Sequence, residues 1–370
     1  MAQNNLIVSS SPHVHSKNAT SSIMWNVSIA LLPASLWGIY AFGFRALLVL
    51  AVSIVSSVAV EWVLLKISKD ASVKDGSAFL TGLLIGLNMP VDVALFVPII
   101  ASAFAIFVVK WSFGGLGANW MNPALAGRVF VFFSFTSLMN TYRMPRTLAP
   151  YVVDSSSSAT VLSQIKVAVA DKAAPYMSST EILGATNYPH TAFAENVSGL
   201  FSSFNLNVSE YTIDAFFGNI PGCIGEISAF LLIIGGVYLV VKKIITWHIP
   251  LSFLGSFALF AWVFGGLRNS MGLFSGDFVL QVFSGGMIIG AIFMATDMVS
   301  SPVTRKGMLI YGVGIGFFSF LLRYFGSLPE SVSLAILLVN IFVPTIDRYI
   351  MPKRFGEVIK QPKKKKEVKI

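Results

Sequence analysis

A short apolar stretch in the first half of the chain, Ser77-Ala-Phe-Leu-Thr-Gly-Leu-Leu-Ile-Gly-Leu-Asn-Met-Pro90, decides the fold. Its small residues allow helices to pack closely in a membrane, but packing alone does not explain why the stretch ends in Asn88 and Pro90. Irregular backbone at membrane depth is tolerated only where protein or a water-filled cavity covers it. The stretch therefore predicts a helix that breaks inside the bilayer.

A second stretch of the same kind lies in the other half of the chain, Ser284-Gly-Gly-Met-Ile-Ile-Gly-Ala-Ile-Phe-Met-Ala-Thr-Asp297. It also combines small and apolar residues, and it also ends in polar residues, Thr296 and Asp297. Each stretch is the third long apolar run of its half. With five runs per half, the second copy must be inverted in the membrane. Inverted repeats whose broken helices meet near the midplane are typical of transporters.

The composition places the whole chain in a membrane. Of 370 residues, 55% are hydrophobic and only 12% are charged, and the mean hydropathy is +0.75. These values exclude a soluble enzyme and a disordered chain. Ten apolar runs are long enough to span a bilayer. They cover about 23–44, 46–65, 78–98, 93–109 and 123–139 in the first half, and 220–241, 249–267, 278–298, 307–325 and 331–350 in the second.

The runs and the polar stretches between them predict an all-α polytopic membrane protein. We expect ten transmembrane helices, arranged as two inverted five-helix repeats with broken third helices. The expected parts are a cytoplasmic N-terminal segment (1–22), a first five-helix repeat (23–139), an external insert (140–219), a second five-helix repeat (220–350) and a basic cytoplasmic tail (351–370).

The distribution of Lys and Arg predicts the orientation. From Lys353 to Ile370 the chain has eight Lys or Arg and two Glu, which gives +6 of the net charge of +9. Such a tail suits a cytoplasmic end near anionic lipid, or simply a solvated tail that ends the last helix. With this tail inside, the inner loops hold Lys66, Lys69, Lys74, Lys110, Lys242, Lys243, Arg305 and Lys306, and the outer loops hold Arg45, Arg268 and Arg323. Both termini are thus predicted inside and the insert outside.

Several polar residues fall within or at the ends of the apolar runs. A carboxylate at the bilayer centre costs about 2.5–3.5 kcal/mol, so such residues usually face a cavity or a partner. Asp297 is the first candidate for a cavity-lining or cofactor-binding group, and Asn88 is its counterpart in the other repeat. Asn119 and Asn122 suit either a cofactor site or a helix start, with Asn122 as N-cap before Pro123. The other carboxylates of this kind are Asp92, Glu226 and Asp347.

The polar insert contains a Ser-rich segment, Asp154-Ser-Ser-Ser-Ser-Ala-Thr160. By composition it is a loop like many others, but its residues resemble the flavinylation signature of membrane flavoproteins, Asp-x-x-Ser/Thr-x-Ala-Thr. The resemblance implies that the Thr160 hydroxyl is esterified to the phosphate of FMN, while Asp154, Ser157 and Ala159 complete the signature. It also implies a separate flavin transferase that uses FAD as the donor.

Other cofactor sites are weaker candidates. Gly184-Ala-Thr186 also ends in Ala-Thr, but Thr180 stands where the acidic residue belongs. Cys223 is the only cysteine, which excludes an internal disulfide and any four-cysteine iron–sulfur or zinc site made by this chain alone. The sequence therefore predicts a flavin and no metal.

Four further motifs run along the chain. They are Gly114-Gly-Leu-Gly-Ala-Asn-Trp-Met-Asn-Pro-Ala-Leu-Ala-Gly127, Gly222-Cys-Ile-Gly-Glu226, Phe293-Met-Ala-Thr-Asp-Met-Val-Ser-Ser-Pro-Val-Thr-Arg-Lys-Gly307 and Asn340-Ile-Phe-Val-Pro-Thr-Ile-Asp-Arg-Tyr349. Together with the Thr160 segment, they resemble the NqrB/RnfD family, which are integral subunits of ion-translocating electron-transport complexes. The resemblance covers about residues 23–356, and the short N-terminal segment favours the RnfD branch. Met298 and Ser158 depart from the usual Pro and Gly, but neither removes the Thr160 hydroxyl.

The resemblance implies a redox subunit of an Rnf complex, which couples the redox chemistry of ferredoxin and NAD to movement of Na+ or H+. It implies covalent FMN on Thr160 at the outer side and a non-covalent riboflavin buried in the membrane part. The implied partners are the other Rnf subunits, above all the other FMN-carrying subunit. The implied location is the cytoplasmic or inner membrane of a bacterium or archaeon.

Two other functions remain open on the residues alone. Broken helices with polar groups at the midplane would equally suit a channel or transporter of small solutes, like the urea and ammonium channels. The chain could also conduct the ion itself, but few charges line its spans. We expect the chain to contribute to an ion path without forming that path alone.

Overall fold

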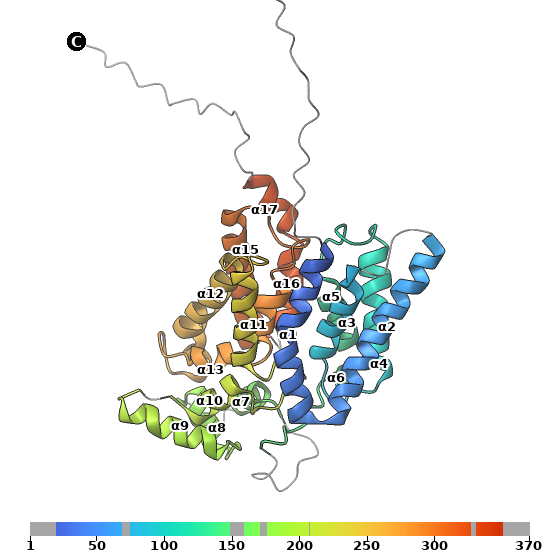
Figure 1. Cartoon of the computed structure of the whole chain (residues 1–370). Coiled ribbons are helices and arrows are strands. Elements are labelled where there is room, and N and C mark those ends of the chain that lie inside the picture. Colours follow the sequence, from blue (N-terminus) through green and yellow to red (C-terminus); the bar gives the residue numbers. More distant parts are fainter. Residues whose placement is uncertain are drawn as a thin grey trace, which may run out of the picture.

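The computed structural model describes residues 20–68, 75–148, 159–170, 176–206, 208–326 and 331–350, and every regular element in these ranges is a helix (Figure 1). The all-helical class expected from the sequence is therefore confirmed for the described part of the chain. Asp154 and Ser157 of the flavin signature, most of the N-terminal segment and the basic tail lie outside the described residues.

Within the described ranges, four helices are long and apolar enough to cross a membrane. They are α1 (Thr20–Phe42), α2 (Phe44–Ser68), α12 (His248–Phe264) with its 3-10 extension η4 (Gly265–Asn269), and α15 (Arg305–Tyr324). A fifth crossing results if α16 (Val332–Asn340) and α17 (Val343–Tyr349), bent by 47°, form one span. The chain is thus a multi-pass membrane protein, while ten spans and inverted repeats remain predictions.

Shorter apolar helices fill the space between the long ones. They are α3 (Ser77–Leu87), α4 (Phe96–Ala103) continued by the π-helix η2 (Phe104–Trp111), α5 (Pro123–Ser134), α11 (Ala229–Val241), α13 (Phe278–Phe283), α14 (Met287–Ile289) and the π-helix η5 (Gly290–Met294). The helices of the first half form one group and those of the second half another (Figure 1). The groups meet where α1 packs against α11 and where α5 packs against α16.

α3 ends inside the bundle, as its polar end predicts. The Gly225 N–H donates to Leu87 O at 2.8 Å, and the Ile224 N–H donates to Met89 O at 3.1 Å. A Cβ on Gly225 would lie 2.5 Å from the Cβ of Leu87, so only glycine permits this approach. Backbone from the second half therefore covers the break in the first half, which is the condition for irregular backbone at membrane depth.

The matching stretch of the second half breaks earlier than its polar end predicts. α13 stops at Phe283, and Gly285 and Gly286 then adopt positive φ angles of 65° and 69°. The Arg323 guanidinium donates to the carbonyls of Ser284, at 3.3 Å, and Gly285, at 3.0 Å. The sequence places Arg323 in a short outer loop. That prediction is wrong, because the structure buries Arg323 in the last turn of α15, where it satisfies this break.

The insert between the two halves is largely helical. It contains α7 (Val161–Ala170), α8 (Ser179–Ala185), α9 (Ala192–Ser203) and α10 (Glu210–Phe217), after the short α6 (Thr136–Met139). These helices have a hydrophobic cluster of their own, which includes Ile165, Ile182 and Tyr211. Figure 1 shows α7–α10 at the end of the molecule opposite α17. The outer location of this end stays a prediction.

Candidate functional site

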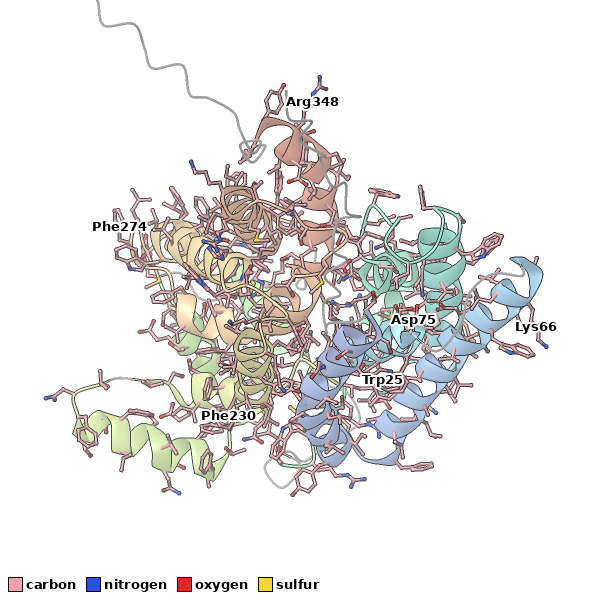
Figure 2. The ribbon with its side chains drawn as sticks, turned by 45° about the horizontal axis from the view of Figure 1, so that its top comes forward. Trp25, Lys66, Asp75, Phe230, Phe274 and Arg348 are labelled. Atoms are coloured by element: carbon pink, nitrogen blue, oxygen red, sulfur yellow. The ribbon has the colours of Figure 1, made fainter. Side chains whose placement is uncertain are left out.

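A cavity of about 850 Å³ lies where the two halves of the chain meet, beside the end of η5. Residues of α1, α3, η2 and η5 line it, together with the loop that leads into α5. Trp25 and Asp75 lie close together where α1 and α3 begin (Figure 2). Of the four intramembrane residues singled out from the sequence, Asn119, Asn122 and Asp297 line this one cavity.

Asn122 links the start of α5 to the end of η5. Its Oδ1 accepts the N–H groups of Ala124, at 3.0 Å, and Leu125, at 3.3 Å, so the predicted N-cap before Pro123 is confirmed. Its amide nitrogen donates to Met294 O at 3.1 Å. One side chain therefore satisfies backbone groups of both halves.

The other three residues hold their local backbone. Asn88 lies behind the cavity and not in its wall; its amide donates to Leu84 O at 2.7 Å and contacts Met294 Sδ at 3.8 Å. Asn119 donates to Met121 O at 3.0 Å. Asp297 accepts the Ser300 hydroxyl at 2.9 Å. Asn119 and Asp297 can thus present polar atoms to a ligand, whereas the Asn88 amide is used within α3.

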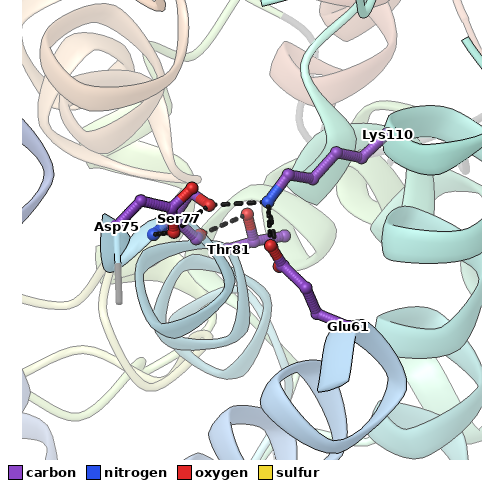
Figure 3. Close-up of polar contacts among 5 residues, drawn as sticks. All are labelled: Glu61, Asp75, Ser77, Thr81 and Lys110. Carbon is purple, nitrogen blue, oxygen red and sulfur yellow. Dashed lines mark hydrogen bonds and ion pairs between the residues drawn. The ribbon is translucent and has the colours of Figure 1, made fainter. Parts of the chain in front are cut away.

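A buried charge cluster adjoins the same cavity (Figure 3). The Lys110 ammonium lies 2.8 Å from both carboxylate oxygens of Glu61 and donates to Ser77 Oγ at 2.6 Å. Ser77 Oγ in turn donates to Asp75 at 2.8 Å, and the Thr81 hydroxyl donates to Ser77 O. Lys110 and Glu61 are only 5% and 7% exposed, and Lys110 and Ser77 also line the cavity.

The sequence analysis missed this cluster and placed Lys110 in a short inner loop. The structure corrects this, because Lys110 lies within η2 and not in a loop. A buried ammonium needs a paired carboxylate, and Glu61 of α2 supplies it from 49 residues away. A signal was present in the sequence, since Glu61 and Lys110 are single opposite charges near the ends of two apolar runs.

The remaining intramembrane carboxylates have structural partners. Asp92 forms an ion pair with Arg143 at 2.6 Å. Glu226 accepts the Cys223 N–H at 2.9 Å, which satisfies backbone just before α11. Asp347 accepts the Val303 N–H at 3.2 Å. Neither Asp92 nor Asp347 lines the 850 Å³ cavity.

Thr160 caps the first turn of α7. Its Oγ accepts the Ser163 N–H at 3.2 Å and donates to Ser163 Oγ at 3.0 Å, while the Gln164 N–H donates to Thr160 O at 2.9 Å. Thr160 is 5% exposed and lines a cavity of about 290 Å³ that also touches Glu226 and Gly285. The candidate hydroxyl therefore lies at a helix N-terminus, beside the break between α13 and α14.

The residues around Thr160 are fixed by hydrogen bonds. Burial raises the pKa of Tyr188, so its phenol stays protonated and donates to Ala159 O at 3.0 Å. The weaker candidate, Thr186, is the C-cap of α8, and its hydroxyl donates to Ile182 O at 3.0 Å within the same helix. Thr160 alone of the two lines a described cavity with residues of the second half.

These features define a class: a multi-pass helical membrane protein with a polar cavity between its halves and a capped threonine in its insert. The model of the NQR2, RnfD, RnfE family matches residues 7–356. The chain therefore belongs to the NQR2, RnfD, RnfE family.

Two relatives are each 38% identical to the chain and match 96% of it and 97% of their own length. One is the RnfD component of the proton-translocating ferredoxin:NAD(+) oxidoreductase complex of Clostridium ljungdahlii. The other is the RnfD component of the Na(+)-translocating ferredoxin:NAD(+) oxidoreductase complex of Acetobacterium woodii. A third relative is the corresponding component of an ion-translocating oxidoreductase complex of Stutzerimonas stutzeri. It is 33% identical over 92% of this chain and 93% of its own length.

Proposed function

We propose that this chain is the integral RnfD component of an ion-translocating ferredoxin:NAD+ oxidoreductase complex, in which it carries electrons coupled to ion transport. The match along 96% of the chain to relatives named for that complex carries the proposal. Those relatives are named for H+ and for Na+, so the proposal includes either cation. Its partners would be the other subunits, including the second FMN-carrying one.

The proposal includes covalent FMN on Thr160. A flavin transferase would join the phosphorus of the FMN half of FAD to Thr160 Oγ and release AMP, while the hydroxyl proton passes to a base of the transferase. The position suits a phosphodiester, because N–H groups and the dipole at a helix N-terminus favour an anion. Thr160 caps the ten-residue helix α7. Since Thr160 is 5% exposed, the transfer requires the first turn of α7 to open.

The proposal also includes a non-covalent riboflavin in the 850 Å³ cavity, which lies within the usual range for small-ligand pockets of about 300–1,000 Å³. The amide of Asn119 and the ammonium of Lys110 would face the polar edge of an isoalloxazine ring. Leu80, Leu84 and Phe293 would cover its apolar faces. When bound, such a flavin supplies the capacity to accept and release electrons, while the chain supplies its orientation.

The topology proposed for this function has ten spans in two inverted repeats. Both termini would be cytoplasmic, and Thr160 would lie on the outer side. The separation of α7–α10 from α17 at opposite ends of the molecule supports this arrangement (Figure 1).

Mass spectrometry of the purified complex tests the covalent flavin. We expect FMN mass on the peptide that contains Thr160, and loss of that mass and of in-gel fluorescence under UV light in Thr160→Ala. Thr186→Ala is the matched control, since Thr186 also follows Ala but only caps α8. Fluorescence that survives Thr160→Ala and disappears in Thr186→Ala would show that the assignment is wrong.

Extraction of non-covalent flavin tests the second site. We expect Asn119→Ala to lower extractable riboflavin at least tenfold while leaving the covalent FMN in place. Asn140→Ala is the control, because Asn140 is exposed and its amide donates only to Thr136 O near the opposite end of α5. Equal riboflavin content in both variants would remove Asn119 from the site.

A further inference from the structure

A second polar cavity, of about 450 Å³, runs along α7 beyond Thr160. Three basic side chains from three different elements line it: Lys166 of α7, Arg268 of η4 and Arg323 of α15. Leu162 and Ile165 of α7 form apolar wall beside them. None of the described residues that line this cavity is acidic. The cavity therefore combines an apolar surface with a concentrated positive charge.

The two guanidinium groups are held in place by uncharged partners. Arg268 donates to Tyr324 O at 2.6 Å, and Arg323 donates to Gln281 O, Ser284 O and Gly285 O. Arg323 also lies 5.2 Å from the centre of the Phe257 ring. Hydrogen bonds to carbonyl oxygens fix a guanidinium without neutralising its charge. Both positive charges are thus oriented within the cavity wall.

The third cation experiences the other two. The pKa of Lys166 is lowered to about 8, first by burial and then by the charges of Arg268 and Arg323. The acidic side chain that interacts with Tyr324 in this wall is Asp277, which does not line the cavity. An anion that entered the cavity would therefore be attracted by all three cations in a partly desolvated place.

The cavity lies within reach of a group attached to Thr160. Six residues separate Thr160 from Lys166, which corresponds to about 9 Å along the axis of α7. Leu162 lines both the Thr160 cavity and the basic cavity. Gly285 joins them as well, because a Cβ there would lie 2.3 Å from Leu162 and 3.0 Å from the Arg323 guanidinium.

We propose that this basic cavity receives the pyrimidine edge of the flavin esterified to Thr160, so that Lys166, Arg268 and Arg323 stabilise the negative charge of the reduced ring. The inference rests on the proposed FMN at Thr160. Reduction by two electrons, supplied by the neighbouring electron carriers of the complex, and one proton leaves one negative charge on the ring. Charge near this edge is one of the means by which a protein tunes a flavin. The three cations are therefore positioning and tuning residues.

The midpoint potential of the covalent flavin in the purified complex tests the inference. We expect Lys166→Met to retain the FMN mass on Thr160 but to weaken the reduced state at least tenfold, which lowers a two-electron midpoint by about 30 mV. Lys166→Arg should keep the original potential, because it keeps the charge. Lys306→Met removes a charge from the exposed first turn of α15, at the opposite end of that helix from Arg323, and should leave the potential unchanged.

The outcomes separate this inference from the proposed function. Wild-type protein without FMN on Thr160 would overturn the proposed function before any potential is measured. FMN present with the same potential in wild type, Lys166→Met and Arg268→Gln would overturn the inference alone. An equal shift in Lys306→Met would also overturn it, since that result reports only the overall charge. Arg268→Gln provides a second reading where Lys166→Met yields too little complex.

Discussion

The position of the Lys110 ammonium follows from its need for a partner. Lys110 is buried within η2, and both carboxylate oxygens of Glu61 lie 2.8 Å away. The attraction between buried charges offsets a large desolvation cost only while both partners are present. The pair therefore fixes η2 against α2 and also leaves a positive charge at the wall of the central cavity.

Removing one partner of this pair should be far more damaging than removing both. We expect Lys110→Met to lower the free energy of unfolding by about 3–5 kcal/mol, because Glu61 is then left buried and unpaired. The double variant Lys110→Met with Glu61→Leu should recover most of that loss. Unfolding of the three variants in mixed detergent micelles measures the difference. A double variant no more stable than the single one would contradict the role of the pair.

At the scale of elements, close helix contact between the halves depends on small residues. A Cβ on Gly235 of α11 would lie 2.3 Å from the Ala30 carbonyl oxygen of α1, a distance that backbone cannot accommodate without moving. Gly255 on α12 offers the opposite case, because a Cβ there would have no neighbour within 4 Å. The two glycines have the same local helical conformation but different packing.

This contrast gives a prediction for the interface between α1 and α11. Gly235→Ala should lower the free energy of unfolding by about 1–3 kcal/mol, because the added methyl group overpacks the contact. Gly255→Ala should be neutral or stabilise by up to about 1 kcal/mol, since alanine favours a helix over glycine. Thermal unfolding in detergent compares the two variants. Equal destabilisation by both would show that helix contact at Gly235 is not the cause.

The insert helix α7 should respond to pH through Lys166. Its folded-state pKa, about 8, lies below the ordinary value of 10.5, mainly because of burial. Between these two values the unfolded chain binds more protons than the folded chain, so the stability rises with pH from about 8 to 10.5. Below pH 8 the lysine is charged in both states and the destabilisation is fully present.

The measurement is the melting temperature of flavin-free Thr160→Ala protein at about pH 7.5 and about pH 10, on either side of the folded-state pKa. We expect Lys166→Met in that background to raise the melting temperature at the lower pH and to show a smaller gain on going to the higher one. The difference between the two proteins isolates Lys166 from other groups that titrate in the same range. Identical pH dependence in both would contradict the lowered pKa.

At the scale of the whole molecule, local patterns predicted the helical class, the Asn122 cap and the interruption of α3, because each depends on neighbours in sequence. Lys110 and Arg323 were misplaced in loops, since their partners lie 49 and about 40 residues away. The cavity shared by Asn119, Asn122 and Asp297 also required the packing of both halves. Short sequence motifs identified those residues but could not show that Asn88 lies behind the cavity.

The orientation of the chain can be tested with single cysteines, because Cys223 is the only cysteine and is fully buried. In a Cys223→Ala background, Ser203→Cys would mark the end of α9 and Lys66→Cys the end of α2, both at exposed positions. Figure 2 shows Lys66 at the outer end of α2, and Figure 1 shows this end of α2 far from the insert. We expect a membrane-impermeant maleimide to label Ser203→Cys in intact cells and Lys66→Cys only in inverted vesicles, because the basic residues of the inner loops hold that end in the cytoplasm. Labelling of both cysteines from one side would contradict the predicted topology, and with it the outer position of Thr160.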